Sequence, residues 1–168
     1  MPEPPPEQPL IPLVPSVLDR LIDLEPALSR DPPQGHGQIL RDVLKSVRRD
    51  LENLLNTRVR CKPLPADLQE VHQSLVSYGI PDLCAASMGT KDERDRFCGV
   101  LLAIITQSDK RLHKVRVRSP EQDVSAERKV RFQIEAELWF EPAAESISFD
   151  SALSLVTGTF EVKGQSHE

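Results

Sequence analysis

The residues best suited to specific chemistry lie within residues 42–58, where acids and bases share one side of a predicted helix. The charged residues of this stretch are Asp42, Lys45, Arg48, Arg49, Asp50, Glu52 and Arg58. Arginine presents a planar fork of donors that forms charge-assisted hydrogen bonds with carboxylates. Two roles stay open for Arg48 and Asp50: holding the protein's own helices to its sheet, or orienting the protein against a partner. A charged helix face is also commonly only solvated.

A second charged stretch, KRLHKVRVR at residues 110–118, alternates basic and apolar residues and contains Arg116. Such a basic strand could bind nucleic acid, and the binding would then weaken with salt. The whole chain, however, has a net charge of -5 and only 4% aromatic residues. A nucleic-acid-binding module is therefore the weaker hypothesis.

The sequence lacks the motifs of catalysis and of metal binding. It has no G-x-S-x-G, no H-E-x-x-H and no phosphate-binding glycine loop. Glycoside hydrolysis needs two carboxylates across a cleft, one of them in an apolar pocket, whereas nearly every acid here adjoins a base or lies on a polar face. The cysteines Cys61, Cys84 and Cys98 and the four histidines are scattered. We therefore expect no enzyme activity, no cofactor and no metal site.

Length and composition indicate one small domain. The chain has 168 residues, of which 39% are hydrophobic, and about 120 residues are expected in the globular part. The core must be built mainly from Leu, Val and Ile, so we expect it to be small. A protein with a small core is often stabilised by its partners. No apolar run approaches the roughly 20 residues that cross a bilayer, and no signal peptide is recognised. We expect a cytoplasmic protein without membrane insertion.

The chain divides into four parts. Residues 1–15, with seven prolines, are expected to form a flexible arm. Residues 16–37 form a short docking helix and a linker, residues 38–164 a single α+β domain, and residues 165–168 a disordered tail. The helix predicted at Ser16–Leu24 is too short to be stable alone. Its apolar residues must therefore dock on this domain or on another subunit, with Asp19 and Arg20 at the edge of the contact.

Three further helices follow from apolar residues at helical spacing. They cover Asp42–Arg58, extended upstream to Leu40, then Ala66–Ser77, and then Lys91–Gln107. The predicted buried sides are Leu40, Val43, Leu44, Val47, Leu51, Leu54 and Leu55 in the first helix, Leu68, Val71, Leu75 and Val76 in the second, and Phe97, Val100, Leu101, Ile104 and Ile105 in the third.

Two local motifs set the ends of these helices. Tyr78–Pro81 is a predicted helix stop, because Gly79 can adopt the left-handed conformation and Pro81 prevents the helix from resuming. Thr90 and Glu93 form a capping box that begins the next helix.

After residue 111 the pattern changes from helical to alternating. Strands are predicted at Leu112–Arg118, Lys129–Phe140, Ile147–Leu155 and Thr159–Val162, and the last two are joined by a tight hairpin. Outward Lys or Arg and Glu residues of the first two strands could pair. The fold class is α+β, with about three helices packed on one face of a small, mostly antiparallel sheet of three or four strands that ends in a β-hairpin. Its two edges, the basic strand and the C-terminal hairpin, could each accept a partner's strand.

Four blocks of sequence occur in a recognisable order: PSVLDRLIDLEP at residues 15–26, RRDLENLLNTR at 48–58, SLVSYGIPDL at 74–83, and RDRFCGVLLAIITQSDKRLHKVRVR at 94–118. Together they resemble the TssE family, small baseplate subunits of bacterial type VI secretion systems related to the sheath-initiating wedge proteins of contractile phage tails. The resemblance departs at Asp109-Lys110-Arg111, where the family usually has Glu-Pro-Arg. Arg111 keeps the family residue and Asp109 stands in place of the acid, while Lys110 removes the rigid turn that proline imposes.

The resemblance implies a structural subunit that binds the wedge subunits TssF and TssG within a baseplate that also includes TssK. It further implies that this subunit templates the TssB/TssC sheath by strand addition, at the cytoplasmic face of the inner membrane. The implied partner-binding residues are Arg48, Arg49, Asp50, Glu52, Arg58, Asp109, Arg111 and Arg116. The alternative is an equivalent subunit of a phage tail or tailocin-like injector, although SVLDRLIDLEP resembles the secretion branch more closely.

Overall fold

The structure is a computed structural model of the 168-residue chain. It describes residues 17–22, 26–27, 35–59, 65, 67–72, 74–82, 88–120, 129–140 and 143–165. The predicted arm at residues 1–15, the predicted cap Ser16 and residues 166–168 of the predicted tail lie outside the described residues.

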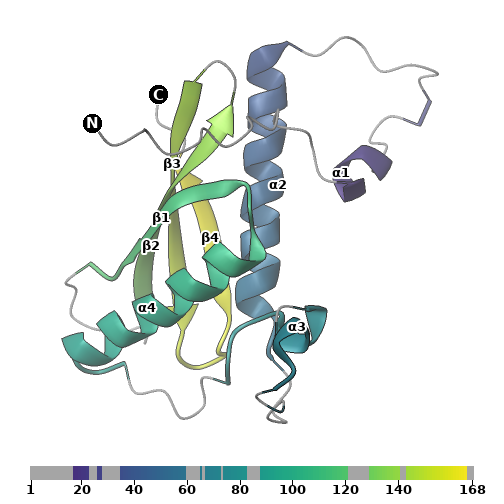
Figure 1. The fold of residues 1–168 in the computed structure, drawn as a ribbon. Helices are drawn as coiled ribbons and strands as arrows, with labels where there is room; N and C mark the ends of the chain where they lie inside the picture. The colour runs from purple at the N-terminus through teal and green to yellow at the C-terminus, as the bar shows by residue number, and fades with distance from the viewer. Residues whose placement is uncertain are drawn as a thin grey trace, which may run out of the picture.

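The described strands form one antiparallel sheet in the order β1-β2-β3-β4, which confirms the predicted α+β fold with its C-terminal hairpin (Figure 1). The strands are β1 (Leu112–Arg118), β2 (Lys129–Phe140), β3 (Ala143–Ser154) and β4 (Phe160–Gln165). β2 and β3 pair along their whole lengths, and β4 is the C-terminal edge. At the β3–β4 turn Gly158 has φ +68° and its N–H donates to the Ser154 carbonyl oxygen over 2.8 Å.

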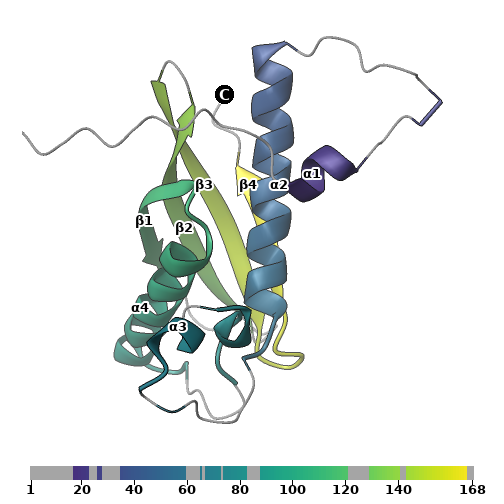
Figure 2. The same ribbon diagram turned by 45° about the vertical axis from the view of Figure 1, so that its right-hand side comes forward.

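The described helices are α1 (Val17–Leu21), α2 (His36–Asn56), α3 (Gln69–His72), the 3₁₀ helix η1 (Leu75–Ser77) and α4 (Lys91–Ser108). α2 begins four residues earlier than the predicted extension to Leu40, because Gly35 is extended and its carbonyl oxygen accepts the first helical hydrogen bonds. α4 begins with the predicted capping box of Thr90 and Glu93. Figures 1 and 2 show α2 upright beside β4 and α4 crossing in front of the sheet.

One core joins α2, α4 and the inward side chains of the sheet. The predicted apolar side of α2 is buried or half-buried, and the inward residues of β2 from Val130 to Leu138 are buried. Phe97, Phe132 and Phe160 form an aromatic cluster with ring centroids 5.5 to 6.4 Å apart. The prediction for Val100 was wrong, because this side chain is 39% exposed on the outer side of α4.

The predicted helix Ala66–Ser77 was also wrong as one continuous element. The chain instead forms α3 and then η1, because the Ser74 hydroxyl accepts from the Val76 backbone N–H and starts a new turn. Leu68, Leu75 and Val76 are exposed rather than buried, Leu75 by 87%. Only Val71 of the predicted buried side is half-buried.

The predicted helix stop at Gly79 is confirmed and fastens this segment to the end of α2. Gly79 has φ +116°, and a Cβ there would lie 2.6 Å from the Thr57 carbonyl oxygen. The next residue, Ile80, is fully buried and donates its N–H to the same carbonyl over 2.9 Å, while the Val59 N–H donates to the Ile80 carbonyl. Only glycine fits this close approach of two backbone segments.

Candidate functional site

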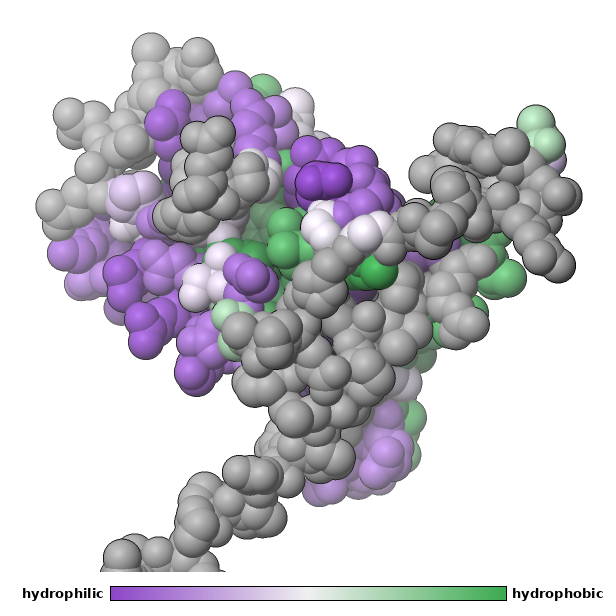
Figure 3. All heavy atoms as spheres, turned by 90° about the horizontal axis from the view of Figure 1, so that it is seen from above, coloured by the Kyte–Doolittle hydropathy of each residue, from purple (hydrophilic) through white to green (hydrophobic). Residues whose placement is uncertain are grey.

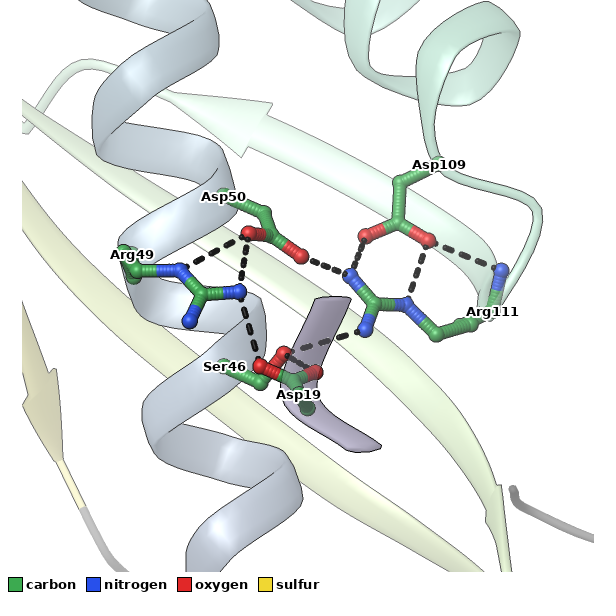
Figure 4. A network of polar contacts seen from close by, with 6 residues as sticks. All are labelled: Asp19, Ser46, Arg49, Asp50, Asp109 and Arg111. Carbon is green, nitrogen blue, oxygen red and sulfur yellow. Dashed lines mark hydrogen bonds and ion pairs between the residues drawn. The ribbon is translucent and has the colours of Figure 1, made fainter. Parts of the chain in front are cut away.

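Arg111 is the centre of a polar network that joins the α4–β1 junction to α2 (Figure 4). Its guanidinium donates to both oxygens of Asp109, over 3.0 Å from Nε and 2.7 Å from Nη2. The same Nη2 donates to Asp50 Oδ2 over 2.7 Å. A bidentate pair of this kind fixes the direction of the guanidinium as well as its charge. The structure thus brings together three predicted site residues, Asp50, Asp109 and Arg111.

The network continues through Arg49 to α1. Arg49 donates to Asp50 Oδ1 over 2.9 Å and forms an ion pair with Asp19 of α1 at 2.9 Å. Ser46 connects the two halves, because its hydroxyl donates to Asp19 Oδ2 and accepts from Arg111 Nη1. Figure 2 shows α1 beside the middle of α2, where these contacts lie. One acidic residue therefore anchors α1 to the domain.

The predicted apolar docking of α1 onto this domain is not what the structure shows. Val17, Leu18, Leu21 and Ile22 are all exposed, and Asp19 carries the described contacts to α2. Seen from above, hydrophilic surface gathers on the left of the molecule, and hydrophobic atoms are visible on the right, where α1 lies in Figure 1 (Figure 3). Docking of these residues on another subunit stays a prediction.

The turn between α4 and β1 is closed by side chains in place of a proline. Asp109 Oδ1 accepts the Arg111 backbone N–H over 3.0 Å, and the Leu112 N–H donates to the Asp109 carbonyl oxygen. Lys110 Nζ donates to the Thr106 carbonyl at the end of α4, where a cation also favours the helix dipole. The departure from Glu-Pro-Arg therefore leaves a hydrogen-bonded turn.

The network holds three carboxylates and two guanidinium groups. The hydrogen bonds with Asp109, opposed by burial, raise the pKa of Arg111, and the bond with Asp50 raises the pKa of Arg49. Nearby, burial and then the charges of Asp50 and Asp109 raise the pKa of Tyr78 above 10.0. Both guanidinium groups of the network thus keep their positive charge at neutral pH, and the network joins α1, α2 and the α4–β1 junction through charge-assisted hydrogen bonds.

The other predicted site residues lie apart from this network. Arg58 donates to the carbonyl oxygens of Leu55 and Gly158, so it links the end of α2 to the β3–β4 turn. Arg48 and Arg116 are exposed, and within the described part of the chain neither side chain forms a hydrogen bond or ion pair. The same holds for the half-buried Glu52 side chain. Their binding of partners stays a prediction.

The two edge strands of the sheet, β4 and β1, differ in how far their edges are open to a partner strand. At β4, the Asn56 side chain accepts from the Phe160 N–H over 2.8 Å and donates to the Phe160 carbonyl over 2.9 Å, as a neighbouring strand would. Phe160 and Val162 are each only 3% exposed. α2 therefore closes the first part of the β4 edge.

At β1 the edge is accessible and irregular. His113, Lys114, Arg116 and Arg118 are exposed, and the register with β2 shifts between His113 and Arg116. Lys114 has φ +48° at this bulge, and the extra residue returns Val115 and Val117 to the core side already occupied by Leu112. The Lys114–Glu137 ion pair at 2.8 Å confirms the predicted cross-strand pairing.

Comparison with known proteins places this geometry in a family. Residues 41–143, which include most of α2, the polar network except Asp19, and the first two strands, match the family of the baseplate wedge protein gp25. The chain belongs to this family. The gp25 family is one of structural baseplate proteins rather than of enzymes. No curated protein matches the sequence.

Within the gp25-family fold, sequence reasoning missed Ser46 and Asn56. Ser46 lies three and four residues before Arg49 and Asp50, so helical spacing could have placed it on their face. Asn56 follows the apolar stripe at the end of the predicted helix, and nothing in the local sequence indicates its contact with a strand 104 residues away.

The described residues show no feature typical of a membrane span or a metal site. No helix in the described ranges is long and apolar enough to cross a membrane. Among the same described residues, no group of three or more His, Cys, Asp or Glu side chains is arranged to hold a metal ion. Cys98 is buried, and burial raises the pKa of its thiol, so it behaves as a small apolar residue.

Proposed function

We propose that this chain is the structural wedge subunit of a type VI secretion baseplate, resembling TssE, which binds TssF and TssG and offers a template for the TssB/TssC sheath. Membership of the baseplate wedge family supports the general role. The protein would act within a baseplate that includes TssK, at the cytoplasmic face of the inner membrane, without catalysis, nucleic-acid binding or membrane insertion.

The observation that carries the templating role is the inequality of the two sheet edges. Asn56 closes the first part of the β4 edge by bonding the Phe160 backbone, whereas the side chains around β1 are exposed. An edge strand can accept a partner strand through its main-chain N–H and C=O groups. We therefore assign strand addition to β1 rather than to the C-terminal hairpin.

The polar network has a positioning role in this proposal. Arg111 and Asp50 fix the start of β1 against α2, so the orientation of the receiving edge depends on them. Arg49 and Asp109 act in the same network, and Arg58 holds the β3–β4 turn to the end of α2. Arg48, Glu52 and Arg116 would contact partners.

The test is co-purification of the tagged full chain from a lysate that contains the wedge and sheath subunits of a type VI system. The wild type and Arg48→Ala are compared with Arg111→Ala, and circular dichroism verifies that each variant is folded. We expect the wild type to recover TssF and TssG, and folded Arg111→Ala to recover less TssB/TssC. Failure of the wild type to recover any of these subunits would refute the proposal, and recovery of phage-tail wedge subunits instead would favour the alternative injector.

A further inference from the structure

The accessible edge of the sheet carries a row of basic side chains. Lys114, Arg116 and Arg118 are exposed on β1, on the sheet face opposite the core. The chain as a whole has a net charge of -5, so the charge of this row is opposite in sign to that of the whole chain.

The neighbouring strand compensates this charge incompletely. Lys114 pairs with Glu137, and Arg116 lies opposite Glu135 in the register, while Arg118 lies opposite the uncharged Gln133. Among the described residues neither Arg116 nor Arg118 forms an ion pair or a hydrogen bond through its side chain. Both arginines therefore border the open edge with unused donors.

The bulge limits where a strand can pair. Lys114, with φ +48°, interrupts the regular ladder, and pairing with β2 resumes at Arg116. On the opposite face, Val115 and Val117 are half-buried against the core. An added strand beside Arg116–Arg118 would thus meet arginines on one face and valines on the other.

We propose that the segment received at the β1 edge is acidic, with Asp or Glu at alternate positions beside Arg116 and Arg118 and apolar residues between them beside Val117. This inference rests on the proposed strand addition at β1. Charge complementarity selects the partner, and main-chain hydrogen bonds supply the ladder. A polyphosphate backbone fits less well, because Glu135 and Glu137 lie on the adjacent strand and β1 carries no Phe, Tyr or Trp on which bases could stack.

The test uses two labelled synthetic peptides of the same length, one alternating Val with Glu and the other Val with Lys. Binding to the full chain is measured by fluorescence anisotropy at low and high salt, with duplex DNA as a third probe. The variant is Arg116→Glu/Arg118→Glu. The matched control, Lys163→Glu, introduces the same kind of charge reversal at the opposite edge, where Lys163 is 70% exposed.

We expect the Glu peptide to bind the wild type and Lys163→Glu, more weakly as salt rises. In Arg116→Glu/Arg118→Glu the affinity for the Glu peptide should fall about 10- to 30-fold, and the preference should shift to the Lys peptide. Equal affinity for both peptides would overturn the charge rule while leaving strand addition intact.

Two further outcomes also overturn the inference. In the first, the chain binds neither peptide but still co-purifies with sheath subunits. The proposed function would then stand, and only the inference about an acidic partner would fail. The other is arginine-dependent binding of DNA without binding of the Glu peptide, which would assign the basic row to nucleic acid.

Discussion

At the scale of single residues, Arg111 does most to connect separate parts of the chain. Its guanidinium bonds Asp109 beside β1 and Asp50 on α2, and it reaches Ser46, which in turn bonds Asp19 on α1. The side chains of Arg111 and Asp109 are only 22% and 12% exposed. Removing the guanidinium would take the described cation away from Asp109 and leave Asp50 paired with Arg49 alone among the described residues, in a partly desolvated place.

We therefore expect Arg111→Ala to lower the free energy of unfolding by about 2 kcal/mol, less than for a fully buried ion pair because Asp50 retains access to water. Urea unfolding measures this change. Arg48→Ala is the matched control on α2, and its effect should stay within about 0.5 kcal/mol. Equal effects of the two variants would show that the network contributes no stability.

Tyr78 gives a direct readout of the network's charge. It is the only tyrosine in the chain, and its pKa is raised by burial and then by Asp50 and Asp109. In Asp50→Asn one of these charges is lost, so the tyrosinate titration followed by ultraviolet absorbance should have a lower midpoint than in the wild type. Glu52→Gln, an acid on the same helix outside this set, is the control, and an unchanged midpoint in Asp50→Asn would contradict the network's geometry.

The same shift predicts how stability changes in alkali. The folded state holds the Tyr78 proton above pH 10.0, where the unfolded chain has begun to release it. The free energy of unfolding should therefore fall as the pH rises from 10.0 toward the higher folded pKa.

At the scale of elements, the end of α2 is fixed by two contacts that lie far apart in sequence. Gly79 approaches the Thr57 carbonyl, and Asn56 bonds the backbone of Phe160. These contacts hold η1 and β4 to the same helix terminus.

Gly79→Ala should destabilise the fold by about 2 kcal/mol or more, because the added Cβ would lie 2.6 Å from a backbone oxygen at a φ that other residues rarely adopt. Gly99→Ala in α4 is the matched control, since no atom lies within 4 Å of its Cβ position. Thermal unfolding should show this control unchanged or slightly stabilised. Similar losses in both variants would argue against the close approach.

Asn56→Ala should lose about 1 to 2 kcal/mol and release the Phe160 amide to solvent, because two hydrogen bonds to the β4 edge disappear. Hydrogen exchange of the Phe160 amide measures the release. Asn53→Ala, an exposed position one turn earlier, should leave that exchange rate as it is. Unchanged protection in Asn56→Ala would show that another group covers this edge.

Periodicity predicted the elements that bury one clear face and failed where a side chain redirects the backbone. β2 was predicted with its observed bounds, α4 with its capping box, and both α2 and α4 with most of their core. The break at Ser74 was missed because a hydroxyl competes with helix continuation there. The bulge at Lys114 was missed because one extra residue leaves no mark in a short alternating segment.

The candidate site was only partly predictable for the same reason. Asp50, Asp109 and Arg111 were named as candidates, yet their mutual contact depends on how α4 and β1 pack against α2. Asp19 was expected at the edge of a contact made by apolar residues, and instead it makes the described contact while those residues stay exposed.

At the scale of the whole molecule, the two sheet edges and α1 differ in how far they are exposed to solvent and to partners. The β4 edge is closed by α2 in its first part, and the β1 edge carries exposed basic side chains. The described contacts of α1 with α2 are made by the Asp19 carboxylate, while the apolar side chains of α1 are exposed. A baseplate wedge protein must contact several neighbours. The exposed surfaces of β1 and α1 are available for such contacts, while the polar network fixes the positions of both elements relative to α2.

The measurement that tests this account most directly is hydrogen exchange of the full chain with and without TssB/TssC and the TssF–TssG pair. We predict that the β1 amides from Arg116 to Arg118 become protected when the sheath subunits are added, while the Phe160 amide of β4 keeps the protection that Asn56 gives it. Complex formation that leaves β1 exchange unchanged, or that protects the β4 edge instead, would contradict strand addition at β1.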